Sequence, residues 1–294
     1  MNSLNKKISL ATIIMMLAII FLIGCGNVSQ STELEKPRPN QLMIKVIDIG
    51  QGDAALLRTA EQTILIDTGD ISERDKLVSF LKKQDIKVID KVIITHPHAD
   101  HLGGMDAVLD NFDVKQVYDS GITTTTKVYR QYLTDIKKKN IPFKVVTGGE
   151  NIDFGGGVTF NVLAPEKPFI EESELNNNSI VGKVAFGKVS MLFTGDIEKE
   201  AEAKLIKNYS PKLKATILKS PHHGSETSSS MAFLRAVSPE VITISLGANN
   251  DYHHPHAKVL KRYKELKSQI LQTDLAGTIT IVTDGQSYNI TKEK

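Results

Sequence analysis

Residues 92–104 of the chain read VIITHPHADHLGG, and this stretch decides the fold. Its apolar, β-branched start, Lys91 to Thr95, is typical of a strand buried on both faces of a sheet. Pro97 has no N–H to donate to a neighbouring strand, so the strand ends there. The turn that follows places imidazole and carboxylate groups directly at the end of a buried strand.

Four potential metal ligands lie in that turn within six residues: His96, His98, Asp100 and His101. Imidazole nitrogen and carboxylate oxygen are ligands of zinc, and manganese and iron accept them too. Four such groups on a tight turn crowd one tetrahedral ion and suit two adjacent ions. We therefore expect His96 and His98 on one ion, and Asp100 and His101 on the other. A solvated loop that is rich in histidine by chance is the alternative, and its position beside a buried strand argues against it.

The pattern His96-x-His98-x-Asp100-His101 resembles the H-x-H-x-D-H signature of the metallo-β-lactamase superfamily of di-metal hydrolases. The resemblance implies an α/β (α+β) fold, a four-layer αββα sandwich in which two sheets face each other with helices outside. It also implies a site for two divalent metal ions, zinc or manganese, at one edge of the sheets.

The bulk composition is compatible with such a domain. The chain has 294 residues, of which 40% are hydrophobic, enough for a substantial core. The net charge is +2, and Lys6 and Lys7 are the only charged residues in the first 24, so charge alone does not demand a nucleic-acid partner. The single cysteine, Cys25, excludes an internal disulfide and a cysteine-rich metal site.

Residues 1–24 resemble an export signal, because Lys6 and Lys7 precede an uncharged, mostly apolar segment. The segment ends in Leu-Ile-Gly-Cys, which resembles the bacterial lipoprotein box and implies cleavage before Cys25 and lipidation of that residue. An uncleaved membrane anchor is the alternative. Residues 25–40 form a polar tether, and residues 41–294 form the hydrolase domain. We expect an exported lipoprotein anchored to the outer face of the cell membrane.

Two further acidic turns precede the histidine stretch. The turn from Asp48 to Asp53 contains Gly50 and Gly52, which allow a tight turn and a close approach of the backbone to a neighbour. Asp67 ends a strand in Asp-Thr-Gly, which matches a superfamily motif whose aspartate supports the metal-binding loop. A plain turn residue is the alternative for Asp67.

Asp196 ends another apolar strand in Thr-Gly-Asp and matches the superfamily's bridging aspartate, which holds both ions. Between His101 and Asp196 the sequence has no histidine, although the superfamily usually has one there. One metal position must therefore take another ligand or be weak. Asn178, in an Asn-Asn-Asn-Ser run, is the candidate for the missing ligand, and a simple turn is the alternative.

Five histidines follow at two later strand ends: His222, His223, His253, His254 and His256. We expect His222 and His254 to compete for the remaining coordination and for proton donation to the leaving group, with His223 in place of His222 as an alternative. His256, after a proline, is a weaker candidate that could simply start a helix. Together with Asp100, His222 and His254 are the candidate catalytic residues.

The whole set of motifs resembles the extracytoplasmic hydrolase domain of the ComEC-type competence (DNA-uptake) family, and also the phosphorylcholine esterase that acts on teichoic acids. The resemblance covers Gln41 to about Ile290. The channel family's multi-helix membrane part is absent, so we do not expect the chain itself to form the pore. The resemblance implies a cell-surface phosphodiesterase or nuclease acting on DNA or a cell-wall phosphodiester, without an obligate protein partner. A hydrolase of other esters or amides, including a β-lactamase, and a non-catalytic binding lipoprotein are the alternatives.

The apolar periodicity also predicts the main elements. We expect strands at residues 42–49, 54–59, 63–66, 91–95, 114–118, 181–186, 189–193, 215–219, 240–246, 279–284 and 286–290, and helices at residues 75–83, 106–112, 127–139, 198–206 and 257–266.

Overall fold

The structure is a computed structural model that describes residues 37–294. The predicted signal peptide, the lipidation residue Cys25 and residues 25–36 of the predicted tether lie outside the described residues. Among residues 37–294, no helix is both long and apolar enough to cross a membrane.

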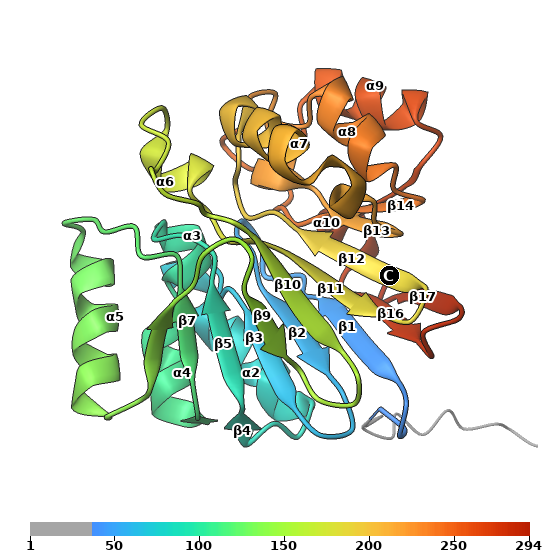
Figure 1. Ribbon diagram of the computed structural model, residues 1–294. Helices are drawn as coiled ribbons and strands as arrows, with labels where there is room; N and C mark the ends of the chain where they lie inside the picture. The colour runs from blue at the N-terminus through green and yellow to red at the C-terminus, as the bar shows by residue number, and fades with distance from the viewer. Residues whose placement is uncertain (1–36) are drawn as a thin grey trace, which may run out of the picture. The chain divides into compact units, whose positions relative to one another are not determined.

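Two β-sheets dominate this part of the chain (Figure 1). One has eight strands in the order β17-β16-β1-β2-β3-β5-β7-β8, and the other has seven in the order β15-β14-β13-β12-β11-β10-β9. The strands of the first sheet are β1 (Leu42–Val46), β2 (Ala55–Arg58), β3 (Thr63–Ile66), β5 (Lys91–Ile94), β7 (Val117–Asp119), β8 (Phe143–Val145), β16 (Ile279–Thr283) and β17 (Tyr288–Lys292). Those of the second are β9 (Asn151–Asp153), β10 (Thr159–Ala164), β11 (Val181–Phe186), β12 (Val189–Phe193), β13 (Ile217–Lys219), β14 (Val241–Ile244) and β15 (Gln269–Gln272). A small parallel pair joins β4 (Val88–Ile89) to β6 (Asp113–Val114).

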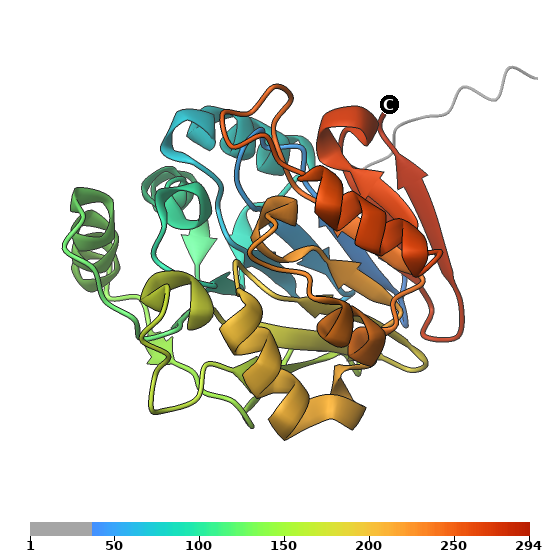
Figure 2. The same cartoon turned by 90° about the horizontal axis from the view of Figure 1, so that it is seen from above.

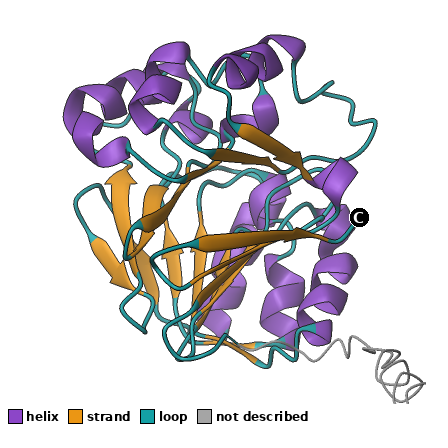
Figure 3. Ribbon diagram, turned by 90° about the vertical axis from the view of Figure 1, so that its right-hand side faces the viewer, coloured by secondary structure: helices purple, strands orange, loops and turns teal. Residues whose placement is uncertain are grey.

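Helices cover the outer face of each sheet, so the chain forms four layers, as Figure 3 shows edge-on. The eight-stranded sheet is covered by α2 (Arg74–Lys83), α4 (Met105–Asn111) and α5 (Lys127–Lys138). The seven-stranded sheet is covered by α7 (Lys199–Leu213), α8 (Met231–Val237) and α9 (Ala257–Glu265). The short elements are η1 (Ile71–Glu73), α3 (Ala99–Leu102), α6 (Glu174–Asn177), η2 (Pro221–Gly224) and α10 (Thr273–Ala276).

The main core lies between the two sheets. It combines side chains such as Ile44 and Ile93 from the first sheet with Phe160 and Met191 from the second. Two more cores lie between each sheet and its helices. Strands such as Lys91–Ile94 are therefore buried on both faces, which is why their sequences are continuous apolar runs rather than alternating ones. The predicted αββα sandwich is confirmed.

Three local predictions were wrong in detail. The predicted strand 114–118 is two short strands, β6 and β7, in different sheets. Helix α7 continues past the predicted end at Ile206 to Leu213, with Pro211 in its last turn. The closing hairpin turns through four residues, 284–287, because the Asp284 carboxylate accepts the N–H groups of Gln286 and Ser287 (both 2.9 Å).

The strand directions bring the donor-rich turns to one edge. β3 is parallel to β5, and β12, β13 and β14 are parallel to one another, so their carboxyl ends share an edge within each sheet. The Ile180 N–H donates to the Thr95 carbonyl (2.9 Å), which links the start of β11 to the end of β5 across the two sheets. In Figure 2, seen from above, α7 to α9 (gold to orange-red) lie in front of the strands.

Candidate metal centre

Asp196 lies at the centre of the histidine cluster, on the turn after β12. Its Oδ1 is 3.3 Å from His101 Nε2. Its Oδ2 is 3.5 Å from His223 Nε2, 3.8 Å from His222 Nε2 and 3.9 Å from His96 Nε2. One buried carboxylate therefore faces four imidazole rings that come from two different strand ends.

Asp100 and His98 complete the group around that carboxylate. Asp100 Oδ2 is 3.3 Å from His223 Nε2 and 3.9 Å from His101 Nε2. His98 Nδ1 lies 3.0 Å from His96 Nε2. Asp100 therefore lies beside His101 and His223, and His98 lies beside His96.

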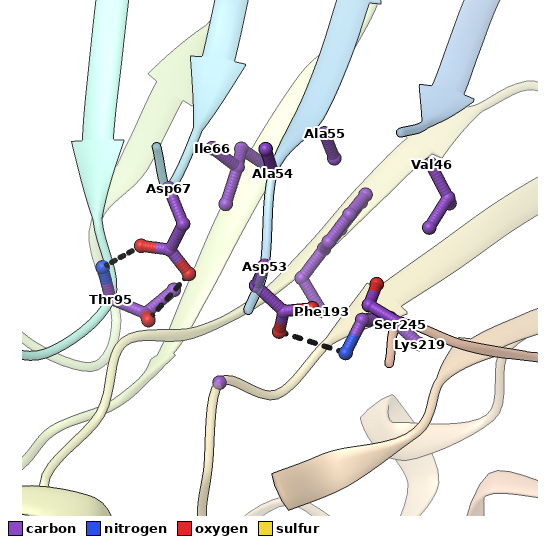
Figure 4. A pocket seen from close by; sticks show the side chains of 11 residues that line it. Val46, Asp53, Ala54, Ala55, Ile66, Asp67, Thr95, Phe193, Lys219 and Ser245 are labelled. Carbon is purple, nitrogen blue, oxygen red and sulfur yellow. Dashed lines mark hydrogen bonds and ion pairs between the residues drawn. The ribbon is translucent and has the colours of Figure 1, made fainter. Parts of the chain in front are cut away.

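Asp67 holds Thr95, the residue before the histidine loop, as Figure 4 shows. Its Oδ1 accepts the backbone N–H of Thr95 (2.7 Å), and its Oδ2 accepts the Thr95 hydroxyl (2.7 Å). The same Oδ2 is 2.8 Å from His101 Nδ1. A carboxylate at Nδ1 keeps a proton on that nitrogen and leaves Nε2 free to bind a metal. Asp67 is thus placed as a support rather than as a ligand.

His223 is oriented in the same way by a backbone oxygen. Its Nδ1 lies 2.9 Å from the carbonyl of Ser245, at the end of β14, and its Nε2 points toward Asp196. The ring is only 1% exposed. Its backbone conformation is left-handed, with φ 51°, as is that of His222 with φ 49°. Such conformations are strained for non-glycine residues and are common at functional sites.

Asp53 and Lys219 form a buried ion pair beside the cluster, with 2.8 Å between Asp53 Oδ2 and Lys219 Nζ (Figure 4). The Asp53 N–H donates to the Asp100 carbonyl (3.0 Å), so the turn before β2 packs against the histidine loop. Gly52 permits this approach, since a Cβ there would lie 2.5 Å from the Asp100 carbonyl oxygen. The predicted close approach of this turn is confirmed.

Burial and charge divide the histidines into two groups. Burial opposes protonation of His223, but the carboxylates of Asp196 and Asp53 outweigh it and raise its pKa to about 10. Burial is likewise outweighed at His101, whose pKa is raised well above the ordinary value by Asp196 and Asp67. At His96, burial dominates and the pKa is well below the ordinary value. Metal ions bind deprotonated imidazole, so they compete with protons for His101 and His223.

Four buried atoms face the centre of this cluster without a hydrogen-bond partner: Asp53 Oδ1, His101 Nε2, Asp196 Oδ1 and His223 Nε2. One ligand atom from each of these four residues can be chosen so that all lie within 4.8 Å of one another. Buried polar atoms are normally hydrogen-bonded, and those that are not need an explanation. Nitrogen and carboxylate oxygen at this spacing fit a divalent metal ion.

An open pocket of about 340 Å³ gives solvent access to the cluster. Its walls include His98, Asp100, Asp196, His222, His223 and His254, with Gln51, Asp70 and Tyr252 at its sides. The ring of His254 stacks on Tyr252 with 5.6 Å between centroids and lies 5.8 Å from the ring of His222. His254 is therefore a pocket-wall residue beside the cluster.

Two predicted site residues lie elsewhere. Asp48 pairs with Lys76 (3.4 Å) and Lys294 (3.0 Å) rather than with a histidine. His256 directly precedes α9 without a side-chain hydrogen bond to that helix, and its Nδ1 accepts the backbone N–H of Glu226 (2.9 Å).

The prediction that Asn178 supplies the missing ligand is wrong. Its Oδ1 accepts the N–H of Ile170, and its Nδ2 donates to the carbonyls of Ile170 and Glu174. The amide is thus fully occupied in holding the loop before α6. The neighbouring Ser179 is the residue that reaches Asp196, because its hydroxyl accepts the Asp196 N–H (3.3 Å).

The sequence reasoning missed Lys219, Thr95, Ser245 and Glu198, all of which contact a cluster residue. A signal existed only for Lys219, which is a lysine at the end of an apolar strand, directly before the Ser-Pro-His-His turn. The other three are ordinary residues in sequence, and only their contacts give them a role.

Comparison with known proteins agrees with this geometry. The "ComE operon protein 3" of Bacillus subtilis is 35% identical over 255 residues, which cover 80% of this chain and 32% of that protein. The "Competence protein ComA" of Neisseria gonorrhoeae is 31% identical over 242 residues, which cover 82% of this chain and 32% of that protein. The chain therefore spans about a third of the length of these relatives.

Two solved structures share the fold. The metallo-beta-lactamase fold protein YhfI of Bacillus subtilis matches with a TM-score of 0.55 at 12% identity, covering 81% of this chain and 99% of that one. Igni18, a metallo hydrolase of Ignicoccus hospitalis, matches with a TM-score of 0.52 at 15% identity, and the match covers 81% of this chain and 98% of that one. The family model described as "Metallo-beta-lactamase superfamily" matches residues 47–248. On this match, and on the fold and donor cluster described above, the chain belongs to the metallo-β-lactamase superfamily.

Proposed function

We propose that this metallo-hydrolase is a phosphodiesterase or nuclease that acts at the cell surface. The observation that carries the proposal is the donor cluster around Asp196, in which histidines on both sides face one carboxylate. The competence proteins at 31–35% identity support a phosphodiester substrate, DNA or a cell-wall polymer. Two divalent ions, zinc or manganese, held by this cluster would polarise a phosphoryl oxygen and provide hydroxide at neutral pH.

The residues of the cluster have separate tasks in this reaction. His96 and His98 would hold one ion and Asp100 and His101 the other, with the carboxylate of Asp196 available to both. His223 belongs with Asp100 and His101, because its Nε2 is 3.3 Å from Asp100 Oδ2. His254 lies on the pocket wall, where burial and the neighbouring histidines lower the pKa of its ring to about 4, so at neutral pH it would accept a proton rather than donate one. An open pocket of about 340 Å³ admits one segment of a polymer with its flanking groups in solvent.

A matched panel of substrates tests this proposal. The purified full-length chain is incubated with single-stranded DNA and with bis(p-nitrophenyl) phosphate, each with zinc and with manganese. Parallel reactions contain a carboxylic ester, p-nitrophenyl phosphorylcholine and a chromogenic β-lactam. We expect cleavage of DNA and of the small phosphodiester, and loss of both in Asp196→Ala. Turnover of the carboxylic ester or the β-lactam without turnover of either phosphodiester would refute the proposal and favour the alternative hydrolase. Turnover of p-nitrophenyl phosphorylcholine alone, which is itself a phosphodiester, would keep a phosphodiesterase of the phosphorylcholine-esterase type and refute the nuclease.

The cell-surface location rests on the sequence of residues 1–25, which lie outside the described part of the chain. We propose that Cys25 is lipidated and anchors the protein to the outer face of the membrane, where several acyl chains hold it stably. Cys25→Ser removes the only thiol, so the variant should be unprocessed or released and should carry no lipid. Normal labelling of Cys25→Ser with radioactive fatty acid would refute the anchor.

A further inference from the structure

His222 has the same arrangement as the two histidines whose Nδ1 is anchored by an oxygen. In His101 and His223, Nδ1 contacts Asp67 Oδ2 (2.8 Å) or a backbone carbonyl (2.9 Å) while Nε2 faces Asp196. In His222, Nδ1 lies 3.2 Å from the Thr227 hydroxyl and 3.4 Å from a carboxylate oxygen of Glu198, and Nε2 lies 3.8 Å from Asp196 Oδ2. A carboxylate behind one nitrogen and a metal in front of the other is the usual setting of a metal-binding histidine.

The backbone conformation at His222 also supports the orientation of its ring toward Asp196. The residue is left-handed, with φ 49° and ψ 46°, and its N–H donates to the Gly195 carbonyl (3.2 Å), next to Asp196. Gly195 is itself left-handed, with φ 52°, and a Cβ there would lie 2.7 Å from the Ser179 Cβ. A hydrogen bond therefore joins two turns with left-handed backbone next to Asp196, and the strain is at His222 rather than at the glycine.

Glu198 is held in place by residues 173–177, which include the first two asparagines of the Asn-Asn-Asn-Ser run. Its Oε1 accepts hydrogen bonds from Asn176 Nδ2 (3.1 Å) and Ser173 Oγ (3.1 Å). Its backbone N–H donates to Asn177 Oδ1 (2.9 Å). The segment thus fixes both the backbone and the side chain of Glu198, and through it the ring of His222.

We propose that His222 is a ligand of the ion held by His96 and His98, and that Glu198 is its positioning residue. The proposal rests on the metal-dependent function proposed above. His222 Nε2 and His96 Nε2 lie at nearly the same distance, 3.8 and 3.9 Å, from the same oxygen of Asp196. An ion beside that oxygen has His96 and His98 on one side and His222 on the other. The asparagines then act on this ion through Glu198 and not as ligands.

His254 fits this place less well. Its ring stacks on that of Tyr252, with 22° between the ring planes. The ring centroid of His254 is 6.4 Å from that of His223, with 18° between the planes, and 5.8 Å from that of His222. It therefore lies outside the ring of nitrogens that surround Asp196, on the pocket wall.

Calorimetric titration of the metal-free full-length chain with Mn²⁺ tests the proposal. We expect two ions per chain in the wild type. His222→Ala should lose one of them or bind it at least 100-fold more weakly. Glu198→Gln should weaken the same ion by 10- to 100-fold, the usual effect of losing such a supporting carboxylate. His254→Ala and Glu200→Gln are the matched controls and should keep both ions. Glu200 lies in the same turn and accepts a hydrogen bond from Asn177 (3.1 Å), but pairs with no histidine.

A spectrum separates the positioning of His222 from a general effect on folding. With Co²⁺ in place of Mn²⁺, the visible absorption reports the ligands of each ion. Glu198→Gln and Asn176→Ala should change the band of one ion only, whereas Glu200→Gln should match the wild type.

The proposal is overturned if His222→Ala binds two ions as tightly as the wild type, if the wild type binds a single ion, or if His254→Ala loses an ion instead. Its failure is distinct from failure of the proposed function. A wild type that binds two ions in the expected pattern but cleaves no phosphodiester refutes the function alone. A wild type that cleaves phosphodiesters while His222→Ala retains both ions refutes the ligand assignment alone.

Discussion

Replacing Asp67 with asparagine reverses the polarity of one hydrogen bond behind the metal centre. Asparagine suits the left-handed backbone of this residue, which has φ 58°, so the substitution adds no backbone strain. Its Oδ1 still accepts the Thr95 N–H, which Asp67 accepts at 2.7 Å. Its NH₂ group takes the place of Oδ2, which lies 2.8 Å from His101 Nδ1. Two donors then face each other at that nitrogen.

His101 can relieve this conflict by moving its proton to Nε2. That nitrogen faces Asp196 at 3.3 Å and is a proposed metal ligand, so the proton blocks it. Loss of such a supporting group costs 10- to 100-fold in metal affinity, or about 1.4–2.7 kcal/mol. The metal-free chain should also lose stability, because Asp67 raises the pKa of His101 there and the protonated ring loses a buried carboxylate partner. Asp67→Ala in addition leaves the buried Thr95 N–H unpaired and should cost about a further 1–3 kcal/mol of stability.

Calorimetric titration with Mn²⁺ measures the effect of Asp67→Asn, and chemical denaturation of the metal-free chain measures its stability. Asp90→Asn is a matched control, because Asp90 accepts a backbone N–H from Thr63 (2.7 Å) just before β5, away from the cluster. If Asp67→Asn bound metal within twofold of the wild type, Asp67 would not act on metal binding through the tautomer of His101.

Three further predictions concern other buried carboxylates. Asp196→Ala should lose more metal by elemental analysis than His256→Ala, because Asp196 faces both metal positions while His256 directly precedes a helix; full metal in Asp196→Ala would contradict the bridging role. Lys219→Met should destabilise the metal-free chain by about 3–5 kcal/mol, because it leaves the Asp53 charge buried and unpaired, and adding Asp53→Asn should recover part of that loss in chemical denaturation. Asp119→Asn should be stabilised relative to the wild type as the pH rises from 4 to 7, by up to about 3 kcal/mol in the free energy of unfolding.

The Asp119 effect follows from the direction of its pKa shift. Burial raises the pKa of this carboxyl to about 6, only partly opposed by hydrogen bonds from Gly121 and Tyr132. Because the folded chain binds this proton more tightly than the unfolded chain, the stabilisation is present below about pH 4 and is lost as the pH rises through about 6. Asparagine resembles the protonated carboxyl at every pH and keeps the stabilisation. Parallel pH profiles of variant and wild type would contradict the shift.

Much of the fold could be predicted because its strands are short, buried and locally distinct. The apolar runs at residues 63–66, 181–186 and 189–193 match β3, β11 and β12. Several elements were not predicted: β10 and α8, although both are largely buried, and two strands with little apolar pattern. β8 (Phe143–Val145) is exposed along its whole length, and β9 (Asn151–Asp153) has one buried residue, so neither carries a periodic signal. Both depend on pairing with a neighbouring strand.

The sequence by itself determined the chemistry of the site, because ligand type and its position after a buried strand are local properties. His96, His98, Asp100 and His101 could be selected on those grounds alone. Only the tertiary structure decided which partner each side chain meets. Asn178 turned out to be bound by nearby backbone, whereas Glu198 reaches His222 across 24 residues of chain. Such partners depend on how separate strands come together at one edge of the sheets. The type of a residue does not indicate which residue far away in the sequence will lie beside it.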